Sequence, residues 1–246
     1  MDIILDMKML AVETATSVQS VALLNGDRIL AESHRDAGGR HGKFLVPAVD
    51  ALLKTAGWQL SEIKGLAVSI GPGSFTGLRV GLATIMGFRM VTGAVMVTVP
   101  TLEAMAWNLQ GFQGRLCPVL QARTREVYWA VFEWHGERLR PVGAERVGSL
   151  ETFAESITDF TIVYGEGWHA NRHELRRLLG SSDRLALEAP PQAAAASACS
   201  VALAACRRLS AGEIAGTGVS PRYVQRAEAE LVMERRAAGR SPGVPG

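Results

Sequence analysis

Apolar residues in the first part of the chain come in short runs whose length and spacing predict β-strands. Three such runs span residues 9–14, 21–24 and 28–33. The last two are separated by Asn25-Gly26, and this dipeptide between apolar runs is a strong hairpin signal. The sequence therefore predicts three antiparallel strands at the start of the fold.

Helix and strand patterns then alternate. From His41 to about residue 56 apolar residues recur at helical spacing, and Gly57 is a typical residue for ending a helix. The elements predicted next are a strand at 66–70, a helix reaching about Val91, a strand at 95–99 and a helix from Thr101. Short, continuously apolar strands between helices are typical of a buried parallel sheet.

The second half repeats this order more faintly. It contains predicted strands at 116–120, 127–134 and 161–164, and predicted helices at 150–156, 170–179 and 193–209. A strand meander followed by helix, strand and helix, present twice, indicates a duplicated α/β unit. We expect an N-terminal lobe at 1–111, a C-terminal lobe at 112–230 and a disordered tail at 231–246, with the boundary in GFQG at 111–114.

The composition is typical of a folded protein, and by itself it indicates no particular function. Hydrophobic residues make up 48% of the chain, charged residues 20%, and the net charge of +2 is too small to indicate nucleic-acid binding. The three cysteines match neither a disulfide framework nor a zinc pattern, so reduced, packed thiols and a cytoplasmic location are expected. Residues 189–206 are uncharged but rich in alanine, which predicts a packed helix and no membrane span.

The start of the chain does not resemble a signal peptide. Asp2 and Asp6 interrupt its apolar residues, and MKMLAVET from Met7 reads like a natural start.

The segment GPGSFTGLRVG at 71–81 lies between a predicted strand and a predicted helix. Its glycines allow a tight turn, and Ser74 and Thr76 are suited to cap the helix. Because helix N-termini bind anions, Ser74 and Thr76 are candidates for nucleotide binding. Thr14 and Thr16, at the end of the first strand, are candidates with them. The P-loop, dinucleotide and nucleophile-elbow patterns do not fit, and a packed turn that binds nothing stays open.

Three further groups of residues have both a functional and a structural interpretation. Gly77, Gly81 and Thr84 form a strip of small residues that suits close approach by the chain's own sheet or by another chain. His169 and His173 have the spacing of a metal pair but lack a third ligand, and His34 and His41 read as loop and helix-start residues. The arginines from Arg222 onward are interleaved with glutamates, which favours a solvated helix over RNA contact.

The motifs together resemble the TsaB family of transfer-RNA threonylcarbamoyladenosine biosynthesis. The resemblance rests on GPGSFTGLRVG at 71–81, LAVETAT at 10–16, His41, EVYWAVFE at 126–133 and PRYVQRAEAE at 221–230. It implies the duplicated ribonuclease-H-like fold with two lobes that is also called the actin-like ATPase, or ASKHA, fold.

The resemblance also implies that this chain lacks catalytic residues, a metal site and a cofactor. In the related TsaD family a His-x-x-x-His pair holds a metal ion, and the matching positions here are Thr101 and Met105. Glu13 and Gln121 stand where many TsaB members have Asp. Without a carboxylate at Gln121, ATP hydrolysis is less expected.

The implied role is a non-catalytic scaffold or activator. It would pair with a TsaD-like catalytic subunit, work with a TsaE-like ATPase, and meet tRNA through the complex, with a homodimer possible when alone. The expected partner interface is Phe44, Ala48, Ala51, Gly77, Gly81 and Thr84. The alternatives are a stand-alone actin-like nucleotide-binding ATPase or kinase, a metallopeptidase, and a homodimer with an independent role.

Overall fold

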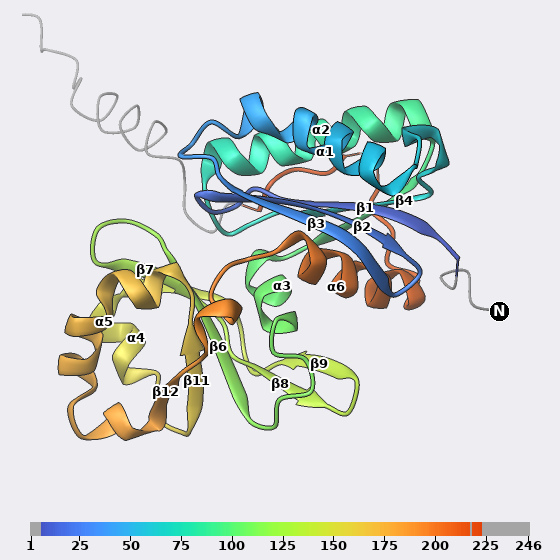
Figure 1. Ribbon diagram of the computed structural model, residues 1–246. Helices are drawn as coiled ribbons and strands as arrows, with labels where there is room; N and C mark the ends of the chain where they lie inside the picture. Colours follow the sequence, from blue (N-terminus) through green and yellow to red (C-terminus); the bar gives the residue numbers. More distant parts are fainter. Residues whose placement is uncertain (1–5, 217, 223–246) are drawn as a thin grey trace, which may run out of the picture.

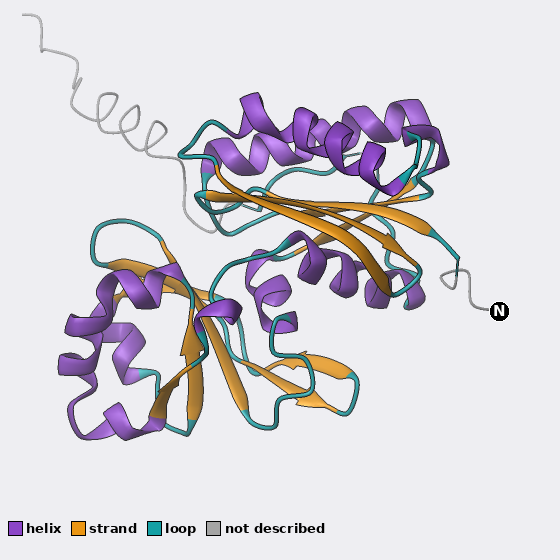
Figure 2. Cartoon of the chain, viewed as in Figure 1, coloured by secondary structure: helices purple, strands orange, loops and turns teal. Residues whose placement is uncertain are grey.

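The computed structural model describes residues 6–216 and 218–222, and it consists of two lobes, each built on one mixed sheet (Figures 1 and 2). The expected tail at 231–246 and most of the motif at 221–230 lie outside the described residues. The first lobe contains β1 (Lys8–Glu13), β2 (Val18–Asn25), β3 (Arg28–Asp36), α1 (His41–Ala56), the 3-10 helix η1 (Leu60–Glu62), β4 (Gly65–Ser69), α2 (Phe75–Thr92), β5 (Val95–Val99) and α3 (Thr101–Trp107).

The second lobe repeats the order with insertions. It contains β6 (Arg115–Gln121), β7 (Glu126–Trp129), β8 (Phe132–His135), β9 (Arg138–Pro141), β10 (Arg146–Ser149), α4 (Leu150–Glu155), β11 (Thr161–Tyr164), α5 (Glu166–Leu179), η2 (Gly180–Leu185), β12 (Ala186–Glu188), η3 (Pro191–Ala193) and α6 (Ala198–Ser210).

Sheet topology demonstrates the duplication. The first sheet has the order β3-β2-β1-β4-β5, and the second has β10-β7-β6-β11-β12. In both, the first three strands are antiparallel and the last two run parallel to the central strand. The predicted duplicated ribonuclease-H-like, actin-like fold is thereby confirmed.

The two lobes exchange helices. In the first lobe α1 and α2 cover one face of the sheet, while α6, from the far end of the chain, covers the other (Figure 1). In turn α3 packs against α6 and against β6 of the second sheet. Successive side chains of β1 point to opposite faces of the sheet. Leu10 and Val12 pack under α1 and α2, whereas Met9 and Ala11 belong to the core shared with α3 and α6.

Several predicted elements need correction. The strand expected at 127–134 is interrupted, because Val131 turns its carbonyl oxygen to the N–H of Val142 at 2.7 Å and so separates β7 from β8. Strands β9, β10 and β12 were not predicted, since they have only three or four residues and little apolar alternation. His34 lies in strand β3 and not in a loop.

Helix boundaries also differ in the second lobe. α5 begins at Glu166, directly after Gly165, and not near residue 170. α6 begins only at Ala198, where the Ser197 hydroxyl accepts from the N–H of Ser200. Among the described residues, none of the helices has both the length and the apolar character to cross a membrane.

Candidate functional site

The glycine segment after β4 packs against the end of β1. The Ser74 N–H donates to the carbonyl oxygen of Ala15 at 2.7 Å, and the Ser74 hydroxyl accepts from the N–H of Gly77 at 3.2 Å. At Gly73, φ is +152°, and a Cβ there would overlap Ala15. The segment is therefore a close-packed strand-to-helix turn capped by Ser74. Both the tight glycine turn and the capping role of Ser74 were predicted.

Gly77 and Gly81 face inward, onto Thr14. A Cβ on Gly77 would overlap the carbonyl oxygen of Thr14, and one on Gly81 would overlap its hydroxyl oxygen. The Thr14 hydroxyl also donates to the carbonyl oxygen of Gly77 at 2.9 Å. The expectation that these two glycines contact a partner is therefore wrong, because the chain's own β1 fills the space that they leave.

The same turn is tied to α3 and to the returning C-terminal segment. The Gly71 N–H donates to the Thr101 hydroxyl at 3.2 Å, and the Thr101 N–H returns a bond to the carbonyl oxygen of Gly71 at 2.8 Å. The Arg222 N–H donates to the carbonyl oxygen of Ile70 at 2.7 Å. Thr101 thus has a structural function at the position where the TsaD resemblance places a metal-binding histidine.

The second lobe repeats this construction. Gly165 and Gly167 follow β11, and a Cβ on either would overlap the backbone of Val119 or Leu120 at the end of β6. This repeat was not predicted from the sequence, although Gly-Glu-Gly directly after an apolar strand was a usable signal. Each lobe thus brings the end of its central strand against a glycine turn, and Glu166 of the second turn is near enough to Glu13 to raise its pKa.

Two carboxyl groups lie at these strand ends. Glu13 ends β1 and is fully buried; one of its oxygens accepts from the Ala15 N–H, and the other has no hydrogen-bond partner among the described residues. Burial raises the pKa of Glu13 to about 7, and the nearby Glu166 acts in the same direction. Burial also raises the pKa of Glu166. Burial thus favours the neutral form of both carboxyl groups.

Gln121 has the position in the second lobe that Glu13 has in the first, as the last residue of the central strand. Its amide nitrogen donates to the carbonyl oxygens of Arg123 and Glu126 at 2.6 and 3.1 Å, and its oxygen accepts from Asn171 at 2.7 Å. Its side chain therefore holds the β6–β7 turn against α5.

The four candidates for nucleotide binding lie on both sides of the first-lobe turn. Thr14 and Thr16 are buried, and their hydroxyls donate to the chain's own carbonyl oxygens, of Gly77 and Val18 respectively. Ser74 caps α2, and Thr76 is exposed in its first turn. The structure brings all four to one place, but three of the hydroxyls already form internal hydrogen bonds.

Met105 lies one helical turn after Thr101 and is fully buried in the shared core, where its carbonyl oxygen accepts from the Tyr164 hydroxyl at 3.2 Å. Within residues 6–216 and 218–222, none of the side-chain clusters holds three or more His, Cys, Asp or Glu in an arrangement for a metal ion. His169 instead contacts Glu188 at 3.2 Å, and burial lowers the pKa of His41 at the start of α1. The three cysteines are free, and they are buried as the prediction of packed thiols requires.

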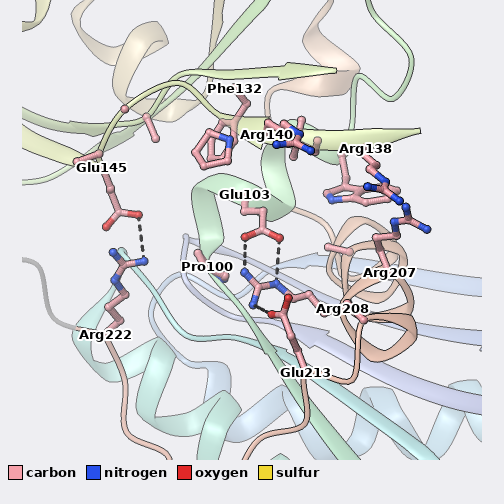
Figure 3. A pocket seen from close by; sticks show the side chains of 18 of the residues that line it. Pro100, Glu103, Phe132, Arg138, Arg140, Glu145, Arg207, Arg208, Glu213 and Arg222 are labelled. Atoms are coloured by element: carbon pink, nitrogen blue, oxygen red, sulfur yellow. Dashed lines mark hydrogen bonds and ion pairs between the residues drawn. The ribbon is translucent and has the colours of Figure 1, made fainter. Parts of the chain in front are cut away.

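The two glycine turns and the strand ends that they hold are called the interlobe site here. A pocket of about 860 Å³ lies apart from them (Figure 3). Its wall includes Arg138, Arg140 and Arg207, which the sequence analysis did not single out. Arg138 and Arg140 are two apart in one strand and so share a face, a pattern that was readable only once β9 had been recognised.

Comparisons with known proteins agree with the fold. The profile of the TsaD family, described as tRNA N6-adenosine threonylcarbamoyltransferase, matches residues 31–164. The tRNA threonylcarbamoyladenosine biosynthesis protein TsaB of Escherichia coli K12 is 34% identical over 174 residues, covering 67% of this chain and 73% of that protein. TsaB of Bacillus subtilis 168 is 27% identical over 153 residues, covering 62% and 67%. The solved structure of YeaZ from Pseudomonas aeruginosa superposes with a TM-score of 0.76 at 27% identity, covering 89% of this chain and all of that one.

The duplicated sheets, the exchanged helices and the paired glycine turns define a two-lobed protein of the actin-like class. The turns hold the two central strands by direct packing, and the sequence similarity extends through both lobes. The chain belongs to the TsaB family, and thus to the proteins of tRNA threonylcarbamoyladenosine biosynthesis.

Proposed function

We propose that this chain is a non-catalytic accessory subunit that pairs with a TsaD-like catalytic subunit and supports formation of the threonylcarbamoyl group on the adenosine 3′ of the anticodon. The observation that supports this most is that Thr101 and Met105, at the positions of the TsaD metal-binding histidines, both have structural roles. One holds the glycine turn and the other fills the shared core. Two imidazoles at these positions would require the core to be rebuilt.

The outer surface of α1 and α2 is the docking surface in this proposal. Met90 and Val91 are 88% and 78% exposed, and Val46 on α1 is 51% exposed. A Cβ on Gly87 would meet nothing within 4 Å, so the helix is open to close approach there. Apolar side chains of this size at high exposure are typical of interaction surfaces.

Four of the six expected interface residues belong to this proposed surface, since Gly77 and Gly81 face inward and do not. Ala51 is exposed, and Phe44, Ala48 and Thr84 are half-buried beside it on α1 and α2. The Arg35 guanidinium lies 4.1 Å from the centre of the Phe44 ring and covers part of it. The outward strip of small residues on α2 is therefore Ala83 and Gly87, next to Met90.

A TsaD-like partner suits this surface because the TsaD profile matches residues 31–164, a range that includes α1 and α2. A partner with the same two helices can pack them against these about an approximate two-fold axis. The same surface would form a homodimer when the partner is absent. In this proposal the complex works in the cytoplasm with a TsaE-like ATPase, and tRNA meets it mainly through the catalytic subunit.

The docking surface is tested with Gly87→Glu and Met90→Asp, mixed with the TsaD-like protein of the same organism and examined by size-exclusion chromatography with light scattering. Both charged variants should weaken association at least tenfold. Gly87→Glu should also raise the free energy of unfolding by about 0.5–1 kcal/mol, because glycine is a poor helix former. Thus a loss of binding cannot come from a loss of folding.

Phe160→Asp is the matched control, since Phe160 is 51% exposed but lies in the second lobe. It should leave association unchanged. Unchanged association in both α2 variants would show that the partner binds elsewhere.

The pathway role is tested by the threonylcarbamoyladenosine content of bulk tRNA, measured by mass spectrometry after depletion of this protein. A collapse that the wild-type gene reverses, and that Gly87→Glu reverses poorly, supports the proposal. An unchanged content would reject the role in the pathway. Full rescue by both α2 variants would reject only the docking surface.

A further inference from the structure

The pocket of about 860 Å³ is formed where the two lobes, α6 and the returning C-terminal segment meet (Figure 3). Its wall comes from α3, the β8–β9 hairpin, residues 143–145, the end of α6, and Arg222. Neither Glu13, Thr14, Gln121 nor Glu166 is part of this wall. The pocket is therefore separate from the interlobe site and from the proposed docking surface.

Positive charge in the pocket exceeds the negative charge available to balance it. The wall contains five arginines and three glutamates. Arg208 is paired with Glu103 at 2.6 Å and with Glu213 at 2.7 Å, and these contacts occupy both of those carboxylates. The pairs form the middle of the wall in Figure 3.

Three arginines of the wall have no counterion among the described residues. Across the part of the chain that the structure describes, Arg138, Arg140 and Arg207 have neither an ion pair nor a side-chain hydrogen bond. Figure 3 shows them on one side of the pocket, away from Glu145 and Arg222. All three are exposed, and guanidinium groups bind phosphate through two parallel N–H donors, so this side of the pocket is suited to an anion.

The other side of the pocket contains a carboxylate that lacks hydrogen-bond donors. The Glu145 side chain is only 9% exposed, and its Oε1 is buried with no hydrogen-bond partner among the described residues. Its Oε2 is 3.8 Å from Arg222, beyond hydrogen-bonding distance. A buried carboxylate oxygen without a partner costs free energy, and a ligand that carries hydroxyl donors would satisfy it.

The size and the lining between these two ends suit a small molecule. Trp107 and Phe132 are mostly buried and supply aromatic surface, and Pro100 and Pro141 add apolar area. A volume near 860 Å³ is within the range of small-ligand pockets. A carboxylate on ribose hydroxyls with phosphate bound apart from it is the arrangement of dinucleotide sites. An RNA backbone would instead need cations along an open surface.

We propose that this pocket binds a nucleoside phosphate, with its phosphates against Arg138, Arg140 and Arg207 and its ribose hydroxyls against Glu145. The accessory subunit then carries a ligand site of its own, in a different place from the glycine turns. The proposal does not depend on the pairing with a TsaD-like protein.

The test is calorimetric titration of the full chain with ADP, AMP and pyrophosphate at fixed salt. Arg138→Ala/Arg140→Ala should weaken ADP binding at least tenfold, because it removes two phosphate contacts. Arg28→Ala/Arg184→Ala is the control of equal charge change and should bind ADP as the wild type does. Both control arginines are exposed and outside the pocket wall. Melting temperatures check that all variants are folded.

Glu145→Gln separates the two halves of the site. It should weaken ADP and AMP binding several-fold and leave pyrophosphate binding unchanged. If it weakened none of them, the ribose contact would be wrong.

Other outcomes overturn the pocket assignment as a whole. Absence of ADP and AMP binding by the wild type at millimolar concentration would do so. Equal ADP affinity in wild type and Arg138→Ala/Arg140→Ala would place the nucleotide elsewhere, in the interlobe site for example. If only binding of transfer RNA fell in that variant, the arginines would be an RNA contact and not a nucleotide site.

Discussion

Glu13 is the residue in which burial and charge conflict most directly. It is fully buried, one of its oxygens has no hydrogen-bond partner among the described residues, and its pKa is raised to about 7. Its strand position matches that of Gln121, which forms a complete set of hydrogen bonds as a neutral amide. The first lobe thus keeps a titrating group where the second has a neutral one.

This difference predicts a pH dependence of stability. The folded state holds the Glu13 proton more tightly than the unfolded state does, so between about pH 4.5 and about pH 7 only the unfolded state releases it. Stability therefore falls as pH rises through this window, by roughly 3 kcal/mol for a shift of this size. Glu13→Gln should remove that loss and raise the free energy of unfolding at about pH 8 by about 1–3 kcal/mol.

Urea denaturation of wild type and Glu13→Gln at about pH 5 and about pH 8 measures this. The two proteins should differ little at the acidic pH, where the folded wild type is protonated. An equal difference at both pH values would mean that the Glu13 proton is not involved.

At the scale of elements, the glycines of α2 differ in their surroundings. The helix contains three glycines, of which Gly77 and Gly81 lie against Thr14 whereas Gly87 faces open space. The same substitution therefore has opposite consequences along a single helix.

Gly77→Ala and Gly81→Ala should each lower the free energy of unfolding by about 1–3 kcal/mol, because the added methyl group overlaps Thr14. Gly87→Ala should raise it by about 0.5–1 kcal/mol through helix propensity. Urea denaturation of the three variants checks both signs. Equal, small effects at all three positions would contradict the close packing of α2 on β1.

Elements were predictable from sequence where apolar spacing was strong, and not where it was weak. The hairpin at Asn25-Gly26, the helix from His41 to Ala56 and the strand Thr161–Tyr164 were correctly predicted. The β9 and β10 strands have only four residues each, RLRP and RVGS, with one aliphatic residue apiece, so only pairing with β8 and β7 identifies them. The direction in which Gly77 and Gly81 face depends on the position of Thr14, which helical spacing alone does not contain.

For the candidate site, the sequence identified the glycine turn but not its counterpart. Ser74 and Gly77 were found because the motif at 71–81 is distinctive, and Thr14 was found in LAVETAT at 10–16. Glu166 and the pocket arginines were missed, because their roles arise only from contacts between distant segments. Arg207 on α6 and Arg138 on β9 reach one pocket through the exchange of helices between the lobes.

At the scale of the whole molecule, that exchange joins the lobes. One face of the first sheet is covered by α6, and Met9, Ala11 and Leu24 belong to the core that α6 completes. The N-terminus of α6 is also held by the first lobe, because Glu32 accepts from the Cys199 N–H at 3.0 Å. The lobes are structural repeats that each have a core of their own, but a third core is shared between them and α6 completes it.

A fragment of residues 1–111 should therefore fail to fold cooperatively, since it lacks α6. The full chain should unfold in a single transition by circular dichroism and by tryptophan fluorescence, which reports Trp58 in the first lobe and Trp129 and Trp168 in the second. A fragment with a cooperative melt, or two separate transitions in the full chain, would show that the lobes are autonomous.

The late position of α6 also imposes an order on biosynthesis. The last strand of the first sheet ends at Val99, and α6 ends at Ser210. The ribosome needs on the order of ten seconds to add the residues in between. Throughout that interval the nascent first sheet has one apolar face uncovered, so each chain passes through a period in which chaperones or neighbouring nascent chains compete with its own final helix.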